Sequence, residues 1–118
     1  MNTSKMVSSI YSVVYVTVPS IEIGKNIAKE IVQKRLAACV NIIPQLTSIY
    51  EWKGKIEEEN ESMLIIKTVK DRLIELEDIV NKLHPYDIPE FIVLPIEKGS
   101  EAYLKWIHEQ TNKEENYN

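Results

Sequence analysis

The sequence predicts an α+β fold in which helices cover one face of an antiparallel sheet. Segments with strand-like and helix-like apolar spacing follow one another in the order strand, helix, strand, strand, helix, strand, helix. The two longer helical segments each carry one apolar stripe, and Lys53-Gly54-Lys55 divides the two middle strands almost symmetrically. With right-handed crossovers, this order favours the ferredoxin-like split βαβ arrangement with a long protruding hairpin.

One hairpin with its turn at Gly54 accounts for the stretch from Cys39 to Thr68. The expected register sets three pairs opposite one another: Trp52 and Ile56, Ile42 and Ile66, and Val40 and Thr68. A turn at 58–61 is less favourable, because 39–43 would then face a helical segment. Each arm spans about 14 residues, or roughly 45 Å, which is too long for one small domain to cover. The excess is expected to associate with a partner. Its apolar side chains are Tyr50, Trp52 and Ile56.

Length and charge indicate one globular domain, residues 1–118, with flexible ends expected at 1–9 and 112–118. The net charge of -4 makes nucleic acid and anionic membranes unexpected partners, although it does not exclude a local basic pocket. The single cysteine, Cys39, suits a reducing compartment. No apolar run of about 18 residues occurs, and the first residues lack the apolar block of a signal peptide. The expected location is the cytoplasm.

The first strand is expected at Ile10 to Val18, where β-branched and aromatic residues predominate and Pro19 ends the run. This pattern predicts a buried central strand. Ser20 then caps a helix, and Glu22 lies in the first turn, where the helix dipole favours a negative charge. The apolar stripe of this helix consists of Ile27, Ala28, Ile31, Val32 and Leu36.

The second half of the chain predicts a helix, a strand and a short helix. Asp71 is the expected cap of the second helix, which His84-Pro85 ends. Its apolar stripe consists of Leu73, Leu76, Val80 and Leu83. The solid apolar run from Phe91 to Leu94 predicts a strand that is buried on both faces or covered by a neighbour. Ser100 then opens the third helix.

Direct signals of chemistry are few. The sequence has no glycine-rich phosphate loop, no Cys-x-x-Cys and no His-x-x-x-His. Nucleophilic catalysis would need a positioned pair such as Cys39 with His84 and a third orienting group. Cys39 fits a small buried residue better than a ligand, whereas capping of a helix end and metal binding are both open for His84.

The hairpin also carries an acidic run and an aromatic pair. In an alternating strand Glu57, Glu59 and Glu61 share one face, and their charges repel one another unless bound cations or lysine side chains neutralise them. A solvated arm or an intersubunit ion-pair patch is the favoured interpretation. Tyr50 and Trp52 also share a face, which favours an interface core over a base-stacking platform in an acidic chain.

Several stretches carry a family resemblance. They are Arg35-Leu-Ala-Ala-Cys-Val-Asn-Ile-Ile-Pro44, Ser48-Ile-Tyr-Glu-Trp-Lys-Gly-Lys-Ile-Glu57, Leu64-Ile-Ile-Lys-Thr68, His84-Pro-Tyr-Asp-Ile-Pro-Glu90, Leu94-Pro-Ile96 and Tyr103-Leu-Lys-Trp-Ile107. From about Ile10 to Ile107 the sequence resembles the CutA divalent-cation tolerance family. The resemblance implies a ferredoxin-like subunit in a tight homotrimer similar to the PII signalling proteins, with hairpins interleaved between subunits. It also implies a link to copper and other divalent cations, but no settled biochemical activity, and we expect a non-enzymatic protein.

The sequence departs from the pattern of some family members at two positions. Val16 stands where they have a cysteine, and Leu83 where they have a second histidine, so His84 alone of that trio is present. One imidazole makes a poor site for a transition metal, because selection normally needs three or four ligands. Copper or a similar ion is therefore expected to bind weakly. The candidate metal ligands are His84 and Cys39.

In a trimer, side chains of different subunits can converge on a cleft. The residues expected to line it are Tyr50, Trp52, Lys67, Tyr86 and Glu90, although each could equally pack or form an ion pair. The expected function is divalent-cation tolerance, with metal binding, in a homotrimer. The alternative is a PII-like regulator that binds a small anionic ligand or a partner protein in these clefts, and an enzyme is the third possibility.

Overall fold

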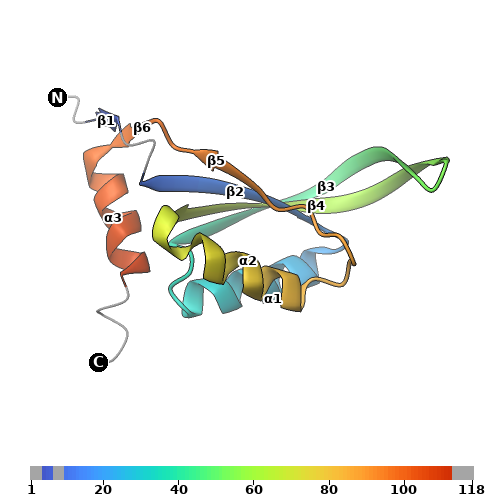
Figure 1. Ribbon diagram of the computed structural model, residues 1–118, viewed down its shortest axis with the longest axis horizontal. Helices are drawn as coiled ribbons and strands as arrows, with labels where there is room; N and C mark the ends of the chain where they lie inside the picture. The colour runs from blue at the N-terminus through green and yellow to red at the C-terminus, as the bar shows by residue number, and fades with distance from the viewer. Residues whose placement is uncertain (1–3, 7–9, 113–118) are drawn as a thin grey trace.

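The computed structural model describes residues 4–6 and 10–112, which form a four-stranded antiparallel sheet, a two-stranded sheet and three helices (Figure 1). The larger sheet consists of β2 (Tyr11–Val18), β3 (Cys39–Trp52), β4 (Lys55–Val69) and β5 (Ile92–Pro95), in the spatial order β3-β4-β2-β5. The smaller sheet pairs β1 (Ser4–Met6) with β6 (Lys98–Ser100). The helical elements are α1 (Ile21–Gln33), η1 (Lys70–Arg72), α2 (Leu73–Leu83) and α3 (Glu101–Thr111).

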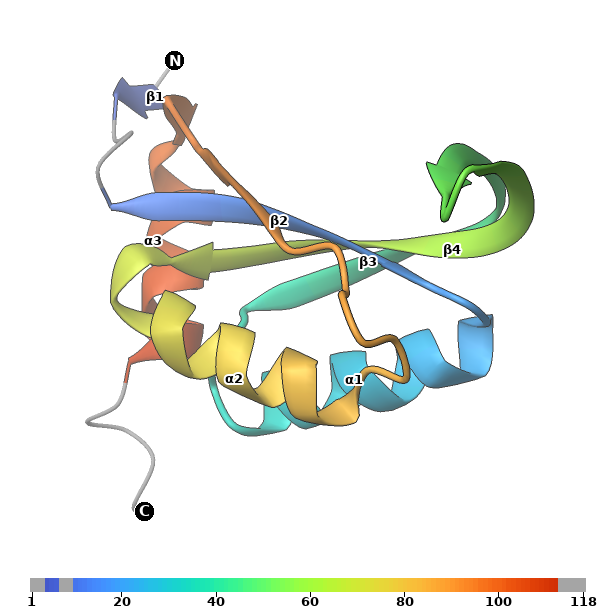
Figure 2. The ribbon, with the colours of Figure 1, turned by 45° about the vertical axis from the view of Figure 1, so that its right-hand side comes forward.

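Helices α1 and α2 lie side by side on one face of the larger sheet, whereas α3 stands at its end (Figure 2). The strand order and the one-sided helices confirm the predicted ferredoxin-like α+β fold. Most of 1–9 and 112–118, where flexible ends were expected, lies outside the described residues. In the described part of the chain, no helix is long and apolar enough to cross a membrane.

The hairpin turn lies where the sequence predicts it, but the predicted register is wrong. Trp52 faces Lys55 across a two-residue turn, because Lys53 and Gly54 both take positive φ angles, 51° and 80°. Two positive φ values are typical of a type I′ turn, whose twist matches that of the flanking strands. The expected pairing of Trp52 with Ile56 would need a longer loop.

A β-bulge between Ile43 and Leu46 shifts the register again. Gln45, inside the bulge, has a φ of 59°, and the neighbouring proline has no N–H to donate to a ladder. At the base of the hairpin the observed pairs are Ile42 with Leu64 and Val40 with Ile66, two residues away from the expected partners. Local apolar alternation does not reveal a bulge, so the sequence predicts the strands but not their alignment.

The core lies between the sheet and the two covering helices. Its fully buried members come from β2, β4 and the helix stripes: Val14, Val16, Val18, Ile27, Ile31, Leu64, Ile66, Leu76 and Val80. Gly24 permits close approach of α1 to the sheet, because a β-carbon there would lie 3.1 Å from Leu64 Cδ2 and 3.2 Å from Val18 Cγ2. Val32 was expected in the α1 stripe but is 41% exposed, since it turns away from the sheet.

Two further expectations about the second half of the chain need correction. Asp71 does not cap a helix, because it lies inside η1, and neither η1 nor α2 has a side-chain cap hydrogen bond. The predicted strand at Phe91 to Leu94 is present as β5, but it is an edge strand with its side chains exposed in the single chain. Although β5 pairs with β2, its apolar side chains are neither buried on both faces nor covered by another element of the described chain.

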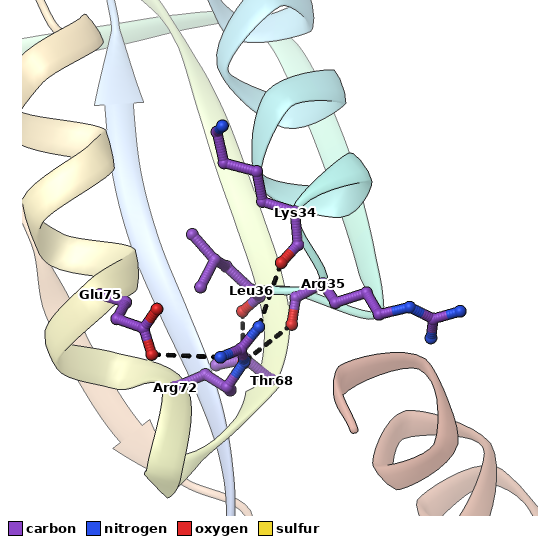
Figure 3. A network of polar contacts seen from close by, with 6 residues as sticks. All are labelled: Lys34, Arg35, Leu36, Thr68, Arg72 and Glu75. Carbon is purple, nitrogen blue, oxygen red and sulfur yellow. Dashed lines mark hydrogen bonds and ion pairs between the residues drawn. The ribbon is translucent and has the colours of Figure 1, made fainter. Parts of the chain in front are cut away.

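A buried arginine ties the start of α2 to the end of α1 (Figure 3). Arg72 is 4% exposed, and its Nε donates to the Arg35 carbonyl oxygen at 3.0 Å. Its Nη2 donates to the Lys34 carbonyl oxygen at 3.1 Å, and its Nη1 pairs with Glu75 Oε1 at 3.1 Å. Next to it, Thr68 Oγ1 donates to the Leu36 carbonyl oxygen at 2.7 Å. The cation thus satisfies carbonyls at a helix C-terminus, where the helix dipole favours positive charge.

Replacing Arg72 with alanine is expected to lower the free energy of unfolding by about 2–3 kcal/mol, because two carbonyls lose their charged donor. The matched control is Lys82→Ala, since the Lys82 ion pair with Asp78 joins side chains that are 68% and 62% exposed. That control should change stability by less than about 0.5 kcal/mol. Urea unfolding at one fixed protein concentration measures both changes, and equal midpoints for the two variants would contradict the role given to Arg72.

Candidate functional site

The structure distributes the candidate site residues over three places. Cys39 and Lys67 lie opposite each other at the α3 end of the sheet, where Lys67 Nζ donates to Asn41 Oδ1. Trp52 lies at the tip of the hairpin. The other candidates gather around the middle of β4, close to the segment that follows α2. They are Tyr50, His84, Tyr86 and Glu90.

His84 ends α2 and has both ring nitrogens engaged. Its residue is 7% exposed, and its backbone N–H donates to the Val80 carbonyl oxygen at 2.9 Å. Because the Thr17 carbonyl only accepts, Nε2 carries the proton and donates to it at 2.7 Å. Nδ1 accepts from the Tyr86 backbone N–H at 3.2 Å. A metal ion could bind His84 only if one of these hydrogen bonds were lost.

Beside His84 lies a group of residues that we name the acidic–aromatic cluster: Tyr50, Glu59, Glu61, Tyr86 and Glu90. Glu61 is 7% exposed, and its Oε2 accepts from the Tyr86 hydroxyl at 2.9 Å. The Tyr50 hydroxyl donates to Glu59 Oε1 in the same way. The ring of Tyr86 also packs against that of His84, with 4.7 Å between the centroids.

The ionisation of the cluster follows from these contacts. Burial raises the pKa of Tyr86, and the hydrogen bond and charge of Glu61 raise it further. The hydrogen bond to Glu59 raises the pKa of Tyr50 to about 12. Burial, together with the charge of Glu61, also raises the pKa of Glu90. Both phenols therefore stay protonated at neutral pH and act as donors to carboxylates.

The cluster is negative and has no ion-pairing cation within the described ranges. The ion pairs found there join Lys34 with Glu30, Arg72 with Glu75, and Lys82 with Asp78. Lys67, the basic member of the predicted cleft, lies at the other end of the sheet, opposite Cys39. The cluster therefore has the charge to attract a cation rather than an anion.

A preformed metal centre is nevertheless lacking in this part of the chain. Among residues 4–6 and 10–112, no group of three or more histidine, cysteine, aspartate or glutamate side chains is placed to hold a metal ion. Cys39 and His84 are also far apart. Cys39 faces Lys67, which faces Val13, while His84 bonds to Thr17, four residues further along β2. This is about 13 Å of strand, so the two cannot share one ion within one chain.

The alternation of the acidic run predicts Glu59 and Glu61 on one hairpin face, but it does not connect them to Tyr50, Tyr86 or Glu90. The run was expected to form a solvated arm or an intersubunit ion-pair patch, although the structure buries Glu61. The Tyr86–Glu61 hydrogen bond joins residues 25 positions apart. The alternation shows neither the observed pairing of Tyr50 with Glu57 nor the return of the chain over β4.

Comparison with known proteins identifies the family. Residues 12–110 match the model of the family described as CutA1 divalent ion tolerance protein. The chloroplastic CutA protein of Arabidopsis thaliana is 53% identical over 109 residues, which are 92% of this chain and 59% of that protein. The divalent-cation tolerance protein CutA of Thermus thermophilus is 50% identical over 84% of this chain and 96% of its own. The chain thus spans about three-fifths of the plant relative and nearly all of the bacterial one.

Solved structures agree with the sequence comparison. The crystal structure of CutA1 from Oryza sativa superposes with a TM-score of 0.86 at 45% identity, and the alignment covers 90% of this chain and 97% of the rice chain. The order of the strands, the one-sided helices and the long hairpin therefore occur together with a matching sequence over almost the whole domain. This chain belongs to the CutA1 divalent ion tolerance family.

Proposed function

We propose that this chain is a non-enzymatic, homotrimeric protein of divalent-cation tolerance that binds copper or a similar divalent ion weakly in the cytoplasm. The observation that carries the proposal is family membership over residues 12–110. The negative acidic–aromatic cluster gives it a physical basis, because its carboxylates have no ion-pairing cation among residues 4–6 and 10–112 and therefore attract positive ions. The same charge gives less support to the PII-like alternative with an anionic ligand. The Arabidopsis relative is named as chloroplastic, so the cytoplasmic part of the proposal is supported only by the features of this sequence.

The edges of the sheet support assembly. β3 and β5 are the two edge strands, and in the single chain each leaves one row of backbone groups without a strand partner. Both edges carry exposed apolar side chains. They are Ile43, Ile49, Tyr50, Trp52 and Ile56 on the hairpin, and Ile92, Val93 and Leu94 on β5. An intersubunit contact would cover these side chains, and the cleft residues Tyr50, Tyr86 and Glu90 would lie next to it.

Trp52→Asp is expected to dissociate the trimer, because it forces a charge into the apolar contact. The matched control is Ile74→Asp, since Ile74 is 87% exposed and lies on α2 rather than on an edge strand. Light scattering at micromolar concentration should give three subunits for the parent and for the control, and fewer for the Trp52 variant. A parent chain that is monomeric under these conditions would remove the basis for the assembly.

If folding and association are one equilibrium, the stability of the parent protein should also rise with protein concentration. Urea titrations over a hundredfold range of concentration measure this dependence. Curves that coincide over the whole range would show that the single chain is stable without its partners.

Copper binding separates the candidate ligands. His84→Ala should chiefly weaken Cu(II) binding, and Cys39→Ser should weaken Cu(I) binding, because a thiolate is the softer ligand. Binding should also weaken on acidification, since metal ligands must be deprotonated. The matched control for the imidazole is His108→Ala, because His108 is an exposed residue on α3. Calorimetry on each protein with each ion gives the affinities.

Two results would change which residues are assigned as metal ligands. If neither His84→Ala nor Cys39→Ser changes copper affinity, neither residue is a ligand. Glu61→Gln then tests the acidic–aromatic cluster, where the amide keeps the size of the side chain but removes its charge. A loss of divalent-cation affinity in that variant would place the ion at the carboxylates rather than at the imidazole or the thiol.

A further inference from the structure

Arg35 occupies a backbone position that normally favours glycine. It follows the end of α1 with a φ of 59°. Its backbone N–H donates to the Val32 carbonyl oxygen at 3.0 Å, and that of Leu36 to the Ile31 carbonyl oxygen at 2.9 Å. These two bonds form a Schellman motif, in which the left-handed residue is usually glycine because a side chain is strained there. The arginine side chain must therefore serve a purpose that glycine could not.

That purpose is visible at the end of α3. Arg35 Nη1 donates to the Glu109 and Gln110 carbonyl oxygens, both at 3.2 Å. Thr111 Oγ1 donates chiefly to the Ile107 carbonyl oxygen at 2.8 Å, so Arg35 supplies the side-chain donor for two of the last four carbonyls of the helix. A guanidinium at a helix C-terminus is also favoured by the helix dipole. These contacts join residues 74 and 75 positions apart.

Arg72 holds Arg35 in position for this contact. Its guanidinium binds the carbonyl oxygens of Lys34 and Arg35, and the side chain of Arg35 points away from it (Figure 3). The backbone turn and the Arg72 contacts therefore direct the Arg35 guanidinium outward from the end of α1. Arg72 and Arg35 together thus connect the start of α2, the end of α1 and the end of α3.

The remaining attachment of α3 is small. Helix α3 stands at the end of the sheet and buries Leu104, Ile107 and Thr111 (Figure 1). Its apolar contacts form a cluster separate from the main core, with Ala38 and Val69 as the other buried members. An element with few buried apolar contacts opens at a lower free energy than the core does.

Helix α3 also covers the start of β3. Ala38 packs in the same cluster as Leu104 and Ile107, directly before Cys39. The Tyr103 hydroxyl lies beside the Cys39 thiol. Burial raises the pKa of this hydroxyl, and its interaction with the Cys39 side chain raises it further. Cys39 is half-buried, so movement of α3 away from the sheet would expose the thiol further.

We propose that Arg35 is a latch that keeps α3 docked, and that loss of the latch lets α3 open separately from the rest of the domain and uncovers Cys39. The latch consists of the Arg35 guanidinium on the Glu109 and Gln110 carbonyl oxygens. Exposure of the thiol follows from release of the helix whether or not Cys39 binds an ion. The role of the latch is therefore independent of the proposed function.

Arg35→Gly tests the latch, because it removes the side chain and relieves the backbone strain at the end of α1 at the same time. In hydrogen exchange of the full chain without added metal, amides of 101–111 should lose protection by about tenfold, a factor equivalent to about 1.4 kcal/mol, which is in the range of one or two hydrogen bonds. Amides of α1, 21–33, should keep or gain protection. Iodoacetamide should alkylate Cys39 faster in this variant than in the parent.

The matched control is Lys34→Gln, one residue earlier, which removes only a surface ion pair with Glu30 and should leave α3 as in the parent. Arg35→Lys, which keeps a positive charge but loses the planar fork, should fall between the parent and the glycine variant, and it replaces that variant if the latter does not fold. Unchanged protection of 101–111 in both Arg35 variants overturns the proposal. An equal loss of protection in α1, α2 and α3 also overturns it, because the domain then opens as one unit.

Discussion

The structure depends on the central position of β4, because its two neighbouring strands pair with it over different lengths. On one side β4 pairs with β3 along nearly its whole length, from Lys55 to Lys67. On the other side β2 covers only Ser62 to Val69. The outer half of the hairpin is therefore a two-stranded ribbon, and such a ribbon is marginally stable in water unless something packs against it. The protruding shape, the exposed apolar side chains and the tendency to associate all follow from this difference.

The difference in paired length also determines where the acidic–aromatic cluster lies. Val18 pairs with Ser62, so Glu61 is the first residue of β4 beyond the end of β2. The segment after α2 passes there, and Tyr86 donates its hydroxyl hydrogen to the Glu61 carboxylate. Burial raises the pKa of Glu90, and the charge of the nearby Glu61 carboxylate raises it further. The cluster thus concentrates negative charge at the point where the domain core ends and the exposed ribbon begins.

The two arginines have a different task in this fold. Arg72 and Arg35 both bind carbonyl oxygens at helix C-termini, and neither guanidinium reaches the acidic–aromatic cluster through a hydrogen bond or ion pair within the described residues. Arg72 joins α2 to α1 on the covered face of the sheet, and Arg35 joins α1 to α3 at its end. The planar fork of arginine suits this task, because it donates to two acceptors at once and stays charged when buried. The arginines therefore organise the helices, while the carboxylates stay available on the hairpin.

The sequence by itself determined the order of the four strands of the larger sheet and the three α-helices, the one-sided helices, the turn at Gly54 and the family, but not the small β1–β6 sheet. These features depend on residues close together along the chain, such as the apolar stripes of the helices and the paired positive φ angles of Lys53 and Gly54. Only the tertiary structure decided the bulge at 43–46, the exposed edge at β5, the Tyr86–Glu61 contact and the two arginine caps. Their partners lie far apart in sequence or depend on how surfaces pack, so local periodicity contains no signal for them. Tertiary contacts likewise gave Glu61 its burial, which an acidic run alone does not predict.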